Sequence, residues 1–160
     1  MSNKELYKKL SYKPVNVFEA SDKEVMNSAF DFCEGYKTFL ASAKTERLAV
    51  KEAVIIAEAA GFKCFEDTGS LKAGDRVYSI NRKKGLFLAV IGSGDIKTQG
   101  VNIVGAHMDV PRLDLKPRPL YEANGLALLK THYYGGIKKY QWTAIPLALH
   151  GVVLTKEGKT

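Results

Sequence analysis

The stretch VNIVGAHMDVPR, residues 101–112, constrains the fold more than any other part of the sequence. It opens with the apolar, β-branched residues Val101, Ile103 and Val104, which predict a buried strand. His107 and Asp109 follow this run, and one residue separates them. In an extended segment, side chains two positions apart project to the same side. Open α/β sheets place functional sites at the ends of buried strands, so this pattern indicates a site.

The His107–Asp109 pair admits two interpretations when it is considered alone. Neutral imidazole is the commonest metal ligand in proteins, and a nearby carboxylate can set its tautomer and orientation. The same HxD string also occurs at strand ends where both side chains are simply solvated, because so short a motif is weakly specific. The surrounding sequence has to decide between a metal ligand and a solvated pair.

Composition indicates an ordinary globular protein. The chain has 160 residues, long enough for one domain with a sizeable core, and it is 46% hydrophobic and 26% charged. No apolar run reaches the roughly 18 residues that a membrane helix needs, and the N-terminus lacks the apolar core of a secretory signal. Cys33 and Cys64 lie far apart without a CxxC motif, so we expect reduced core cysteines in a cytoplasmic protein.

The net charge of +7 raises the question of nucleic-acid binding. Lysines are paired at residues 83–84 and 138–139, and aromatic residues lie near the second pair. Acidic residues are interspersed, however, and no long basic run occurs, which is typical of a solvated surface. The excess of positive charge would also arise if this chain were part of a larger protein whose remainder is acidic.

An amphipathic helix is predicted over residues 22–42. Ser21 and Glu24 have the spacing of a capping box. Behind them, apolar residues recur every three or four positions, which is the period of a helix with one buried face. We expect this face to belong to the core. It comprises Val25, Ala29, Phe32, Cys33, Tyr36, Phe39 and Leu40.

A second helix is predicted over residues 46–60, with Thr45 as its N-cap and Gly61 as its C-terminal stop. The expected buried face includes Leu48, Ile55, Ile56 and Ala59. After this helix the pattern changes to short strands. They are expected at residues 62–65, at 77–80 and 85–91 as a hairpin around the turn 81–84, at 101–106, and later at 126–134 and 147–154. The apolar run GLFLAVI predicts a central strand.

A change in composition at Pro111 predicts a domain boundary. Pro111, Pro117 and Pro119 follow one another closely and would interrupt regular structure. We therefore expect one domain over residues 1–110 and another beginning over residues 111–160. The sequence stops just after a turn-like KEGK segment, so this second domain is expected to be truncated.

Several long motifs resemble one known family. They are GAHMDVPRLDLKP, residues 119–122, KTHYYGGIKKYQW and PLALHG. These segments resemble the N-terminal part of the aspartyl-aminopeptidases, the dinuclear zinc aminopeptidases that include the vacuolar aminopeptidase I type. The resemblance is densest over residues 101–153 and looser over residues 30–100. Motifs of this length are far more specific than an HxD string.

The resemblance implies an α/β fold whose two domains have different roles. Residues 1–110 would be the first part of a zinc-peptidase catalytic domain, with helices on a mixed sheet. Residues 111–160 would begin a β-rich inserted domain that the family uses for oligomer assembly. The implied reaction is removal of the N-terminal residue from peptide substrates by metal-activated water.

The resemblance also implies site residues. His107 would be a metal ligand, and Asp109 would support catalysis by orienting the imidazole. A complete site would hold two zinc ions, although cobalt and manganese accept the same ligands. The remaining ligands and the general base would lie beyond residue 160, so we expect the 160-residue chain to be inactive alone. His132 and His150 are expected to be structural, and the preferred N-terminal residue is not indicated by the sequence.

A second function class stays open on the residues alone. The chain would then be a non-catalytic interaction module that binds through exposed β edges and a basic surface. Nucleic-acid binding is a third and weaker alternative, and no membrane partner is indicated.

Overall fold

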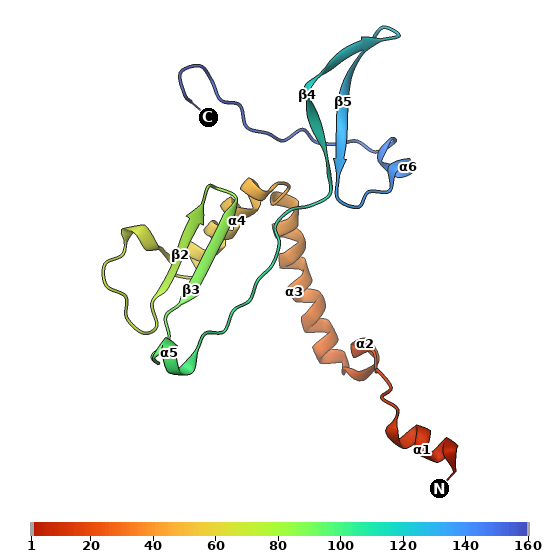
Figure 1. The fold of residues 1–160 in the computed structure, drawn as a ribbon, viewed down its shortest axis with the longest axis vertical. Coiled ribbons are helices and arrows are strands. Elements are labelled where there is room, and N and C mark those ends of the chain that lie inside the picture. The colour runs from red at the N-terminus through yellow and green to blue at the C-terminus, as the bar shows by residue number, and fades with distance from the viewer. Residues whose placement is uncertain (1, 160) are drawn as a thin grey trace. The chain divides into compact units, whose positions relative to one another are not determined.

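The computed structural model describes residues 2–159, and the chain divides into two compact units, Met1–Thr38 and Phe39–Thr160. Figure 1 shows the elements in chain order, from red at the N-terminus to blue at the C-terminus. Helices and short sheets are both present, which confirms the predicted α/β class. Among the described residues, no helix is both long and apolar enough to span a membrane.

The first unit is helical. It contains α1 (Asn3–Leu10), α2 (Val17–Ala20) and most of α3 (Lys23–Ser42). The capping box lies at the start of α1, where Glu5 N–H donates to Ser2 Oγ at 3.3 Å and Ser2 N–H donates to a Glu5 carboxylate oxygen at 2.7 Å. These contacts satisfy two of the amide groups that a helix start leaves unpaired.

Helix α3 confirms the predicted element but corrects its cap. The helix begins one residue later than a Ser21 cap requires, and the Val25 N–H donates instead to Asp22 Oδ1 at 2.9 Å. The expectation that its apolar stripe is part of the core is also wrong, because no side chain of α3 is buried. Periodicity marks which residues share a helix face. Burial also requires another element to pack on that face.

Helix α4 (Glu46–Ala59) begins where predicted and ends one residue before the predicted end at residue 60. The Leu48 N–H donates to Thr45 Oγ1 at 3.3 Å, and Gly61 adopts a positive φ of 84° beyond the C-terminus. Its buried residues are Ala49, Val50 and Ala57. The predicted face was therefore wrong in part, since Ile55 and Ile56 are each 52% exposed. Two apolar faces adjoin on this helix, and local sequence does not say which one meets a neighbouring strand.

A mixed three-stranded sheet follows α4. Its order is β1 (Lys63–Cys64), β2 (Arg76–Asn81) and β3 (Gly85–Val90), with β1 parallel and β3 antiparallel to β2. A 3-10 turn, η1 (Phe65–Asp67), follows β1. The core lies where α4 meets β2, and Val77 and Tyr78 are buried there.

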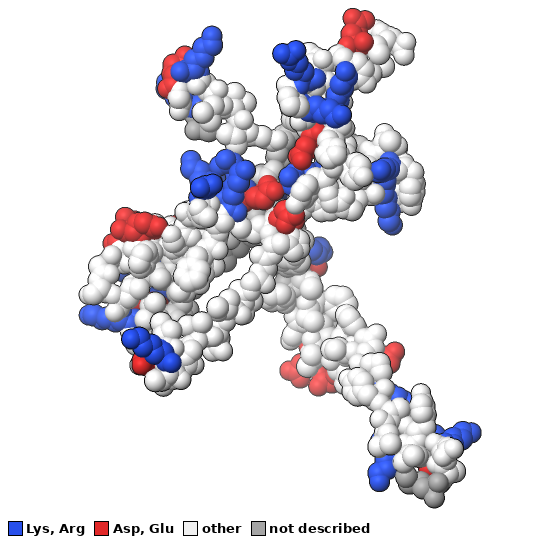
Figure 2. Space-filling view, in the orientation of Figure 1, with Lys and Arg blue, Asp and Glu red and all other residues white. Residues whose placement is uncertain are grey.

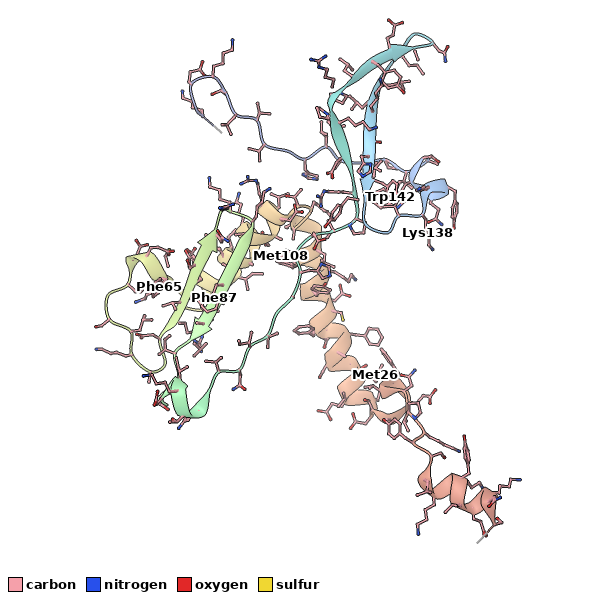
Figure 3. The ribbon with its side chains drawn as sticks, in the orientation of Figure 1. Met26, Phe65, Phe87, Met108, Lys138 and Trp142 are labelled. Carbon is pink, nitrogen blue, oxygen red and sulfur yellow. The ribbon has the colours of Figure 1, made fainter. Side chains whose placement is uncertain are left out.

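The predicted hairpin β2–β3 is confirmed, with Asn81 paired to Gly85. The two central residues of the turn, Arg82 and Lys83, both have positive φ, and the Lys84 N–H donates to the Asn81 carbonyl at 2.9 Å. The prediction that GLFLAVI is a central strand is wrong within the described chain, because β3 lies at the sheet edge and Phe87 is 66% exposed. Figure 3 labels Phe87 on this strand. Apolar composition favours a central strand only where a second neighbour is present to pair with it.

The predicted strand over residues 101–106 is not formed in the described chain. A four-residue helix, α5 (Ile96–Gln99), precedes it, and residues 101–111 are then extended without ladder partners. Val104 is 99% exposed. A β-strand exists through hydrogen bonds to a neighbouring backbone, and the structure supplies no such neighbour here among residues 2–159.

A two-stranded antiparallel sheet follows, made of β4 (Arg112–Ala123) and β5 (Leu126–Tyr134). The bounds of β5 agree with the prediction. The prolines at 117 and 119 do not end β4, as had been expected, but coincide with a register shift between Leu115 and Leu120. Proline is tolerated at such irregularities because it has no N–H to donate.

The turn between β4 and β5 is Asn124-Gly125, with φ angles of 56° and 74°. Asparagine followed by glycine is the strongest short signal for such a turn. Beyond β5, Gly135 and Gly136 form the expected bend, and α6 (Lys139–Trp142) is one helical turn. The strand predicted over residues 147–154 is wrong, because that segment has no ladder partner in the described chain.

The two cysteines are free thiols, as predicted, but they are not core residues. Cys33 is exposed because the whole face of α3 is exposed, and Cys64 is half-buried. On the face drawn in Figure 2, basic and acidic side chains are interspersed. This arrangement agrees with the expectation of a solvated surface.

Candidate functional site

The structure brings His107 and Asp109 into direct contact. His107 Nδ1 lies 3.0 Å from Asp109 Oδ1 and 3.1 Å from the Asp109 backbone oxygen. Met108, the residue between them, is labelled in Figure 3 on the extended segment that leads into β4. The pair therefore lies on the extended chain just before a strand, not at the end of a paired strand as predicted.

This contact selects one tautomer of the neutral imidazole. Both oxygens near Nδ1 are acceptors, so Nδ1 carries the proton that forms the hydrogen bonds. In that tautomer the opposite nitrogen, Nε2, has a free lone pair. The His107 side chain is 85% exposed, so this lone pair is open to a ligand.

Tyr134, the last residue of β5, completes the surroundings of the carboxylate. Its hydroxyl donates to Asp109 Oδ2 at 2.6 Å, while Oδ1 accepts from His107. The Tyr134 hydrogen bond is the main reason that the pKa of Asp109 lies below its usual value, and the backbone and His107 contacts add to the effect. The same bond to Asp109 raises the pKa of Tyr134. Both groups are therefore held in their ordinary forms at neutral pH, one ionised and one protonated.

Arg112, the first residue of β4, is paired with Tyr134 in the register of the hairpin. Its Cζ lies 4.1 Å from the centre of the Tyr134 ring, a cation–π distance. Its Nε donates to Asp114 Oδ1 at 2.8 Å and its Nη1 donates to Glu46 Oε1 at 3.0 Å. The Asp114 bond is the main cause of a raised pKa for Arg112.

These contacts connect three elements around the His107–Asp109 pair. Glu46 lies in the first turn of α4, Arg112 begins β4, and Tyr134 ends β5. Sequence reasoning identified His107 and Asp109 but missed the other three. The signal available for Tyr134 was its place in the KTHYYGG motif. The pairing of Arg112 with Glu46 spans 66 positions, and no local pattern announces it.

The donor set tests whether a metal fits this site. An exposed imidazole with a free Nε2 suits one coordination position. Within residues 2–159, however, no group of three His, Cys, Asp or Glu side chains is arranged to hold an ion. His132 belongs to no such group in this part of the chain, and its ring stacks against Tyr133 with ring centres 5.4 Å apart. The described residues therefore fit one ligand of a metal site and do not make a whole one.

Comparison with known proteins places this chain in a family. Residues 39–160 match the family model described as aminopeptidase I zinc metalloprotease (M18). The "Probable M18 family aminopeptidase 1" of Clostridium acetobutylicum is 47% identical over 147 residues, which are 89% of this chain and 31% of that protein.

Solved structures agree. The crystal structure of aminopeptidase I from Borrelia burgdorferi B31 matches with a TM-score of 0.81 and 41% identity, covering 90% of this chain and 35% of that one. An M18-family aminopeptidase from Thermotoga maritima matches with a TM-score of 0.78 and 43% identity, covering 93% and 32%. The chain spans about a third of the length of these relatives. It belongs to the M18 family of aminopeptidase I zinc metalloproteases.

Proposed function

We propose that this chain is the N-terminal segment of a zinc metalloaminopeptidase that hydrolyses the N-terminal residue from peptides. The observation that carries the proposal is the His107–Asp109 pair, in which the carboxylate contacts Nδ1, favours the neutral tautomer with a free Nε2 lone pair, and leaves the ring exposed. Family membership supports the reaction class, and the partial coverage of the relatives supports a site completed by further sequence.

In this proposal His107 binds zinc through Nε2. Asp109 holds the imidazole in that tautomer and increases its basicity, as a carboxylate partner of a metal-bound histidine does. Bound zinc would supply an activated water and polarise the scissile carbonyl. The remaining ligands and the general base would come from sequence outside this chain, and cobalt or manganese would be accepted by the same kinds of ligand.

The proposal extends to the domains and assembly. Residues 1–110 would contribute to the catalytic domain, and residues 111–160 would begin the β-rich inserted domain. The hairpin β4–β5 and the exposed edge strand β3 support this division, since unpaired edges recruit other strands. We propose a homo-oligomer in the cytoplasm for the full-length protein, and the two free cysteines agree with a reducing compartment.

The alternative is a non-catalytic interaction module. It is favoured by one observation: many large apolar side chains are exposed, among them Phe87 and Val104. Surfaces of this kind mark contact sites for other chains. The two functions differ in their dependence on metal, which makes them separable by assay.

The experiment is a peptidase assay on two proteins. One is a protein of the full length of its M18 relatives that contains this segment, called the family-length protein below, and the other is the 160-residue chain alone. We expect the family-length protein to release N-terminal amino acids, to lose this activity with a chelator, and to regain it with zinc. The 160-residue chain should be inactive in every condition. Absence of metal-dependent release from the family-length protein would favour the interaction module. Chelator-sensitive release by the short chain would contradict the proposed ligand count.

A further inference from the structure

We propose that Tyr134 is a positioning residue that holds Asp109, and through it His107, in the geometry required of a metal ligand. The catalytic consequence rests on the proposed function, whereas the effect on the imidazole tautomer does not. Within residues 2–159, no hydrogen bond joins Tyr134 to His107, and both side chains bond to the carboxylate of Asp109.

Both oxygens of the Asp109 carboxylate are hydrogen-bonded. A carboxylate bonded at one oxygen can still rotate about its side chain. Here Oδ1 accepts from His107 at 3.0 Å and Oδ2 accepts from the Tyr134 hydroxyl at 2.6 Å, so both oxygens are engaged and the carboxylate plane is set. The second distance lies in the range of strong hydrogen bonds to an ionised acceptor.

The backbone around the His107–Asp109 pair is not part of a sheet in the described chain. Residues 101–111 form no ladder with another strand in the described chain, so main-chain pairing does not place Asp109. The Tyr134 hydroxyl bridges 25 positions of sequence to reach it. That contact ties the extended segment to a strand that is itself paired, because Tyr134 lies opposite Arg112 in the hairpin.

Tyr134 is itself held in place by Arg112. The Arg112 guanidinium lies over its ring at 4.1 Å, and that guanidinium is bonded on one side to Asp114 and on the other to Glu46 in α4. The side chains of Arg112 and Glu46 are only 30% and 29% exposed. An arginine bonded at two of its nitrogens has little freedom to move, so the phenol beneath it stays directed at Asp109.

The test compares Tyr134→Phe with Tyr133→Phe. The first variant removes the hydroxyl and keeps the ring beneath Arg112. The second removes a neighbouring hydroxyl that makes no hydrogen bond within residues 2–159, and successive strand residues face opposite sides. The two changes are chemically identical, so they separate the Asp109 contact from a general effect on the hairpin.

The first readout needs no metal. Nitrogen NMR of the His107 imidazole in the 160-residue chain distinguishes the Nδ1-protonated form from the alternative tautomer. We expect Nδ1–H to predominate in the parent chain and in Tyr133→Phe, and its population to fall in Tyr134→Phe. Circular dichroism and thermal unfolding of each variant establish that the chain is folded. Arg112→Met, which frees the ring and retains the hydroxyl, should give a smaller change in the same direction.

The second readout is kinetic, in the family-length protein. Loss of an outer-shell partner of a metal ligand typically costs about 10- to 100-fold in metal affinity or activity. Since Tyr134 acts through two other groups, we expect Tyr134→Phe to lower kcat by about 10-fold with KM nearly unchanged. Tyr133→Phe should retain both constants.

The outcomes distinguish this inference from the proposed function. An unchanged imidazole tautomer in folded Tyr134→Phe overturns the positioning role, as does an equal change in both tyrosine variants. A tautomer shift confined to Tyr134→Phe supports it even if the family-length protein shows no metal-dependent activity, a result that would overturn the proposed function alone. A tautomer shift without loss of kcat would overturn the catalytic consequence.

Discussion

Two regions of this chain are held together by different forces. Around α4 and β2, apolar side chains are buried and the neighbouring elements pack on one another. Every buried hydrophobic side chain in the described chain lies in residues 43–78, namely Ala43, Ala49, Val50, Ala57, Val77 and Tyr78. In the segment from Val101 through β5, no side chain reaches that degree of burial. There the geometry is set by hydrogen bonds and ion pairs around Asp109 and Arg112.

The packed region should determine the stability of the fold, and the hydrogen-bonded region should determine the chemistry of the site. Burying a valine-sized side chain is worth about 1.5–3 kcal/mol, whereas exposed ion pairs contribute little to the stability of a fold. Changes near Val77 should therefore alter the free energy of unfolding, and changes near His107 should alter function without unfolding the chain. The following predictions test this separation, beginning with the largest expected effect.

Replacing His107 with alanine should abolish nearly all activity of the family-length protein and lower its zinc content. Removing a group that only orients a metal ligand typically costs about 10- to 100-fold in activity. The loss of activity here should be larger, because the ligand itself is removed. Zinc analysis and turnover measure the effect. His132→Ala removes an imidazole from the adjoining β4–β5 hairpin and should retain both metal and rate. Full zinc content in His107→Ala would contradict the ligand assignment.

Asp109→Asn should lower turnover by about 10- to 100-fold and leave the fold intact. The amide can donate to His107 as well as accept from Tyr134, so the tautomer that exposes the Nε2 lone pair keeps only the backbone oxygen of residue 109 as a fixed acceptor and is favoured less strongly. Steady-state kinetics and circular dichroism measure the two parts of this prediction. Kinetics equal to those of the parent protein would remove the orienting role from Asp109.

Val77→Ala should lower the free energy of unfolding of the 160-residue chain by about 2 kcal/mol, because it opens a cavity in the packed region. Ile103→Ala serves as the matched comparison. Ile103 is 83% exposed, so its truncation should change stability by no more than about 0.5 kcal/mol. Urea denaturation measures both. Equal losses would show that the extended segment is packed in solution, and the contrast between the regions would fail.

The smallest expected effect is an alkaline transition in the packed region. The Tyr78 hydroxyl donates to Glu58 at 2.6 Å, and this bond is the main cause that raises the pKa of Tyr78 to about 12. An unfolded tyrosine ionises near pH ~10. The stabilising contribution is therefore complete below about pH 10 and is lost as the pH rises through about 12.

Unfolding measured against pH should show this decline in the parent chain and a flatter profile in Tyr78→Phe. Tyr12→Phe is the control, since that ring is 88% exposed. A decline that begins well below pH ~10, or that is unchanged in Tyr78→Phe, would assign it to another group.

The sequence by itself determined the features that depend on near neighbours. Thr45 and Gly61 bound α4 because a cap and a stop act on the adjacent turn of helix. The bounds of β5 followed from its composition and from the glycines beyond it. The His107–Asp109 contact followed from a two-residue spacing in an extended segment, and the long motifs around it predicted the family that the comparisons confirmed.

Only the tertiary structure decided which surfaces meet. Ala49, Val50 and Ala57 are buried on α4 while Ile55 and Ile56 are exposed, because the strand beside the helix selects the face. The apolar run at residues 101–106 remained unpaired in the described chain, since a strand requires hydrogen bonds that its own sequence does not contain. Tyr134 and Glu46 joined the site from 25 and 66 positions away. Contacts at such separations depend on how the chain folds back on itself, which no local pattern records.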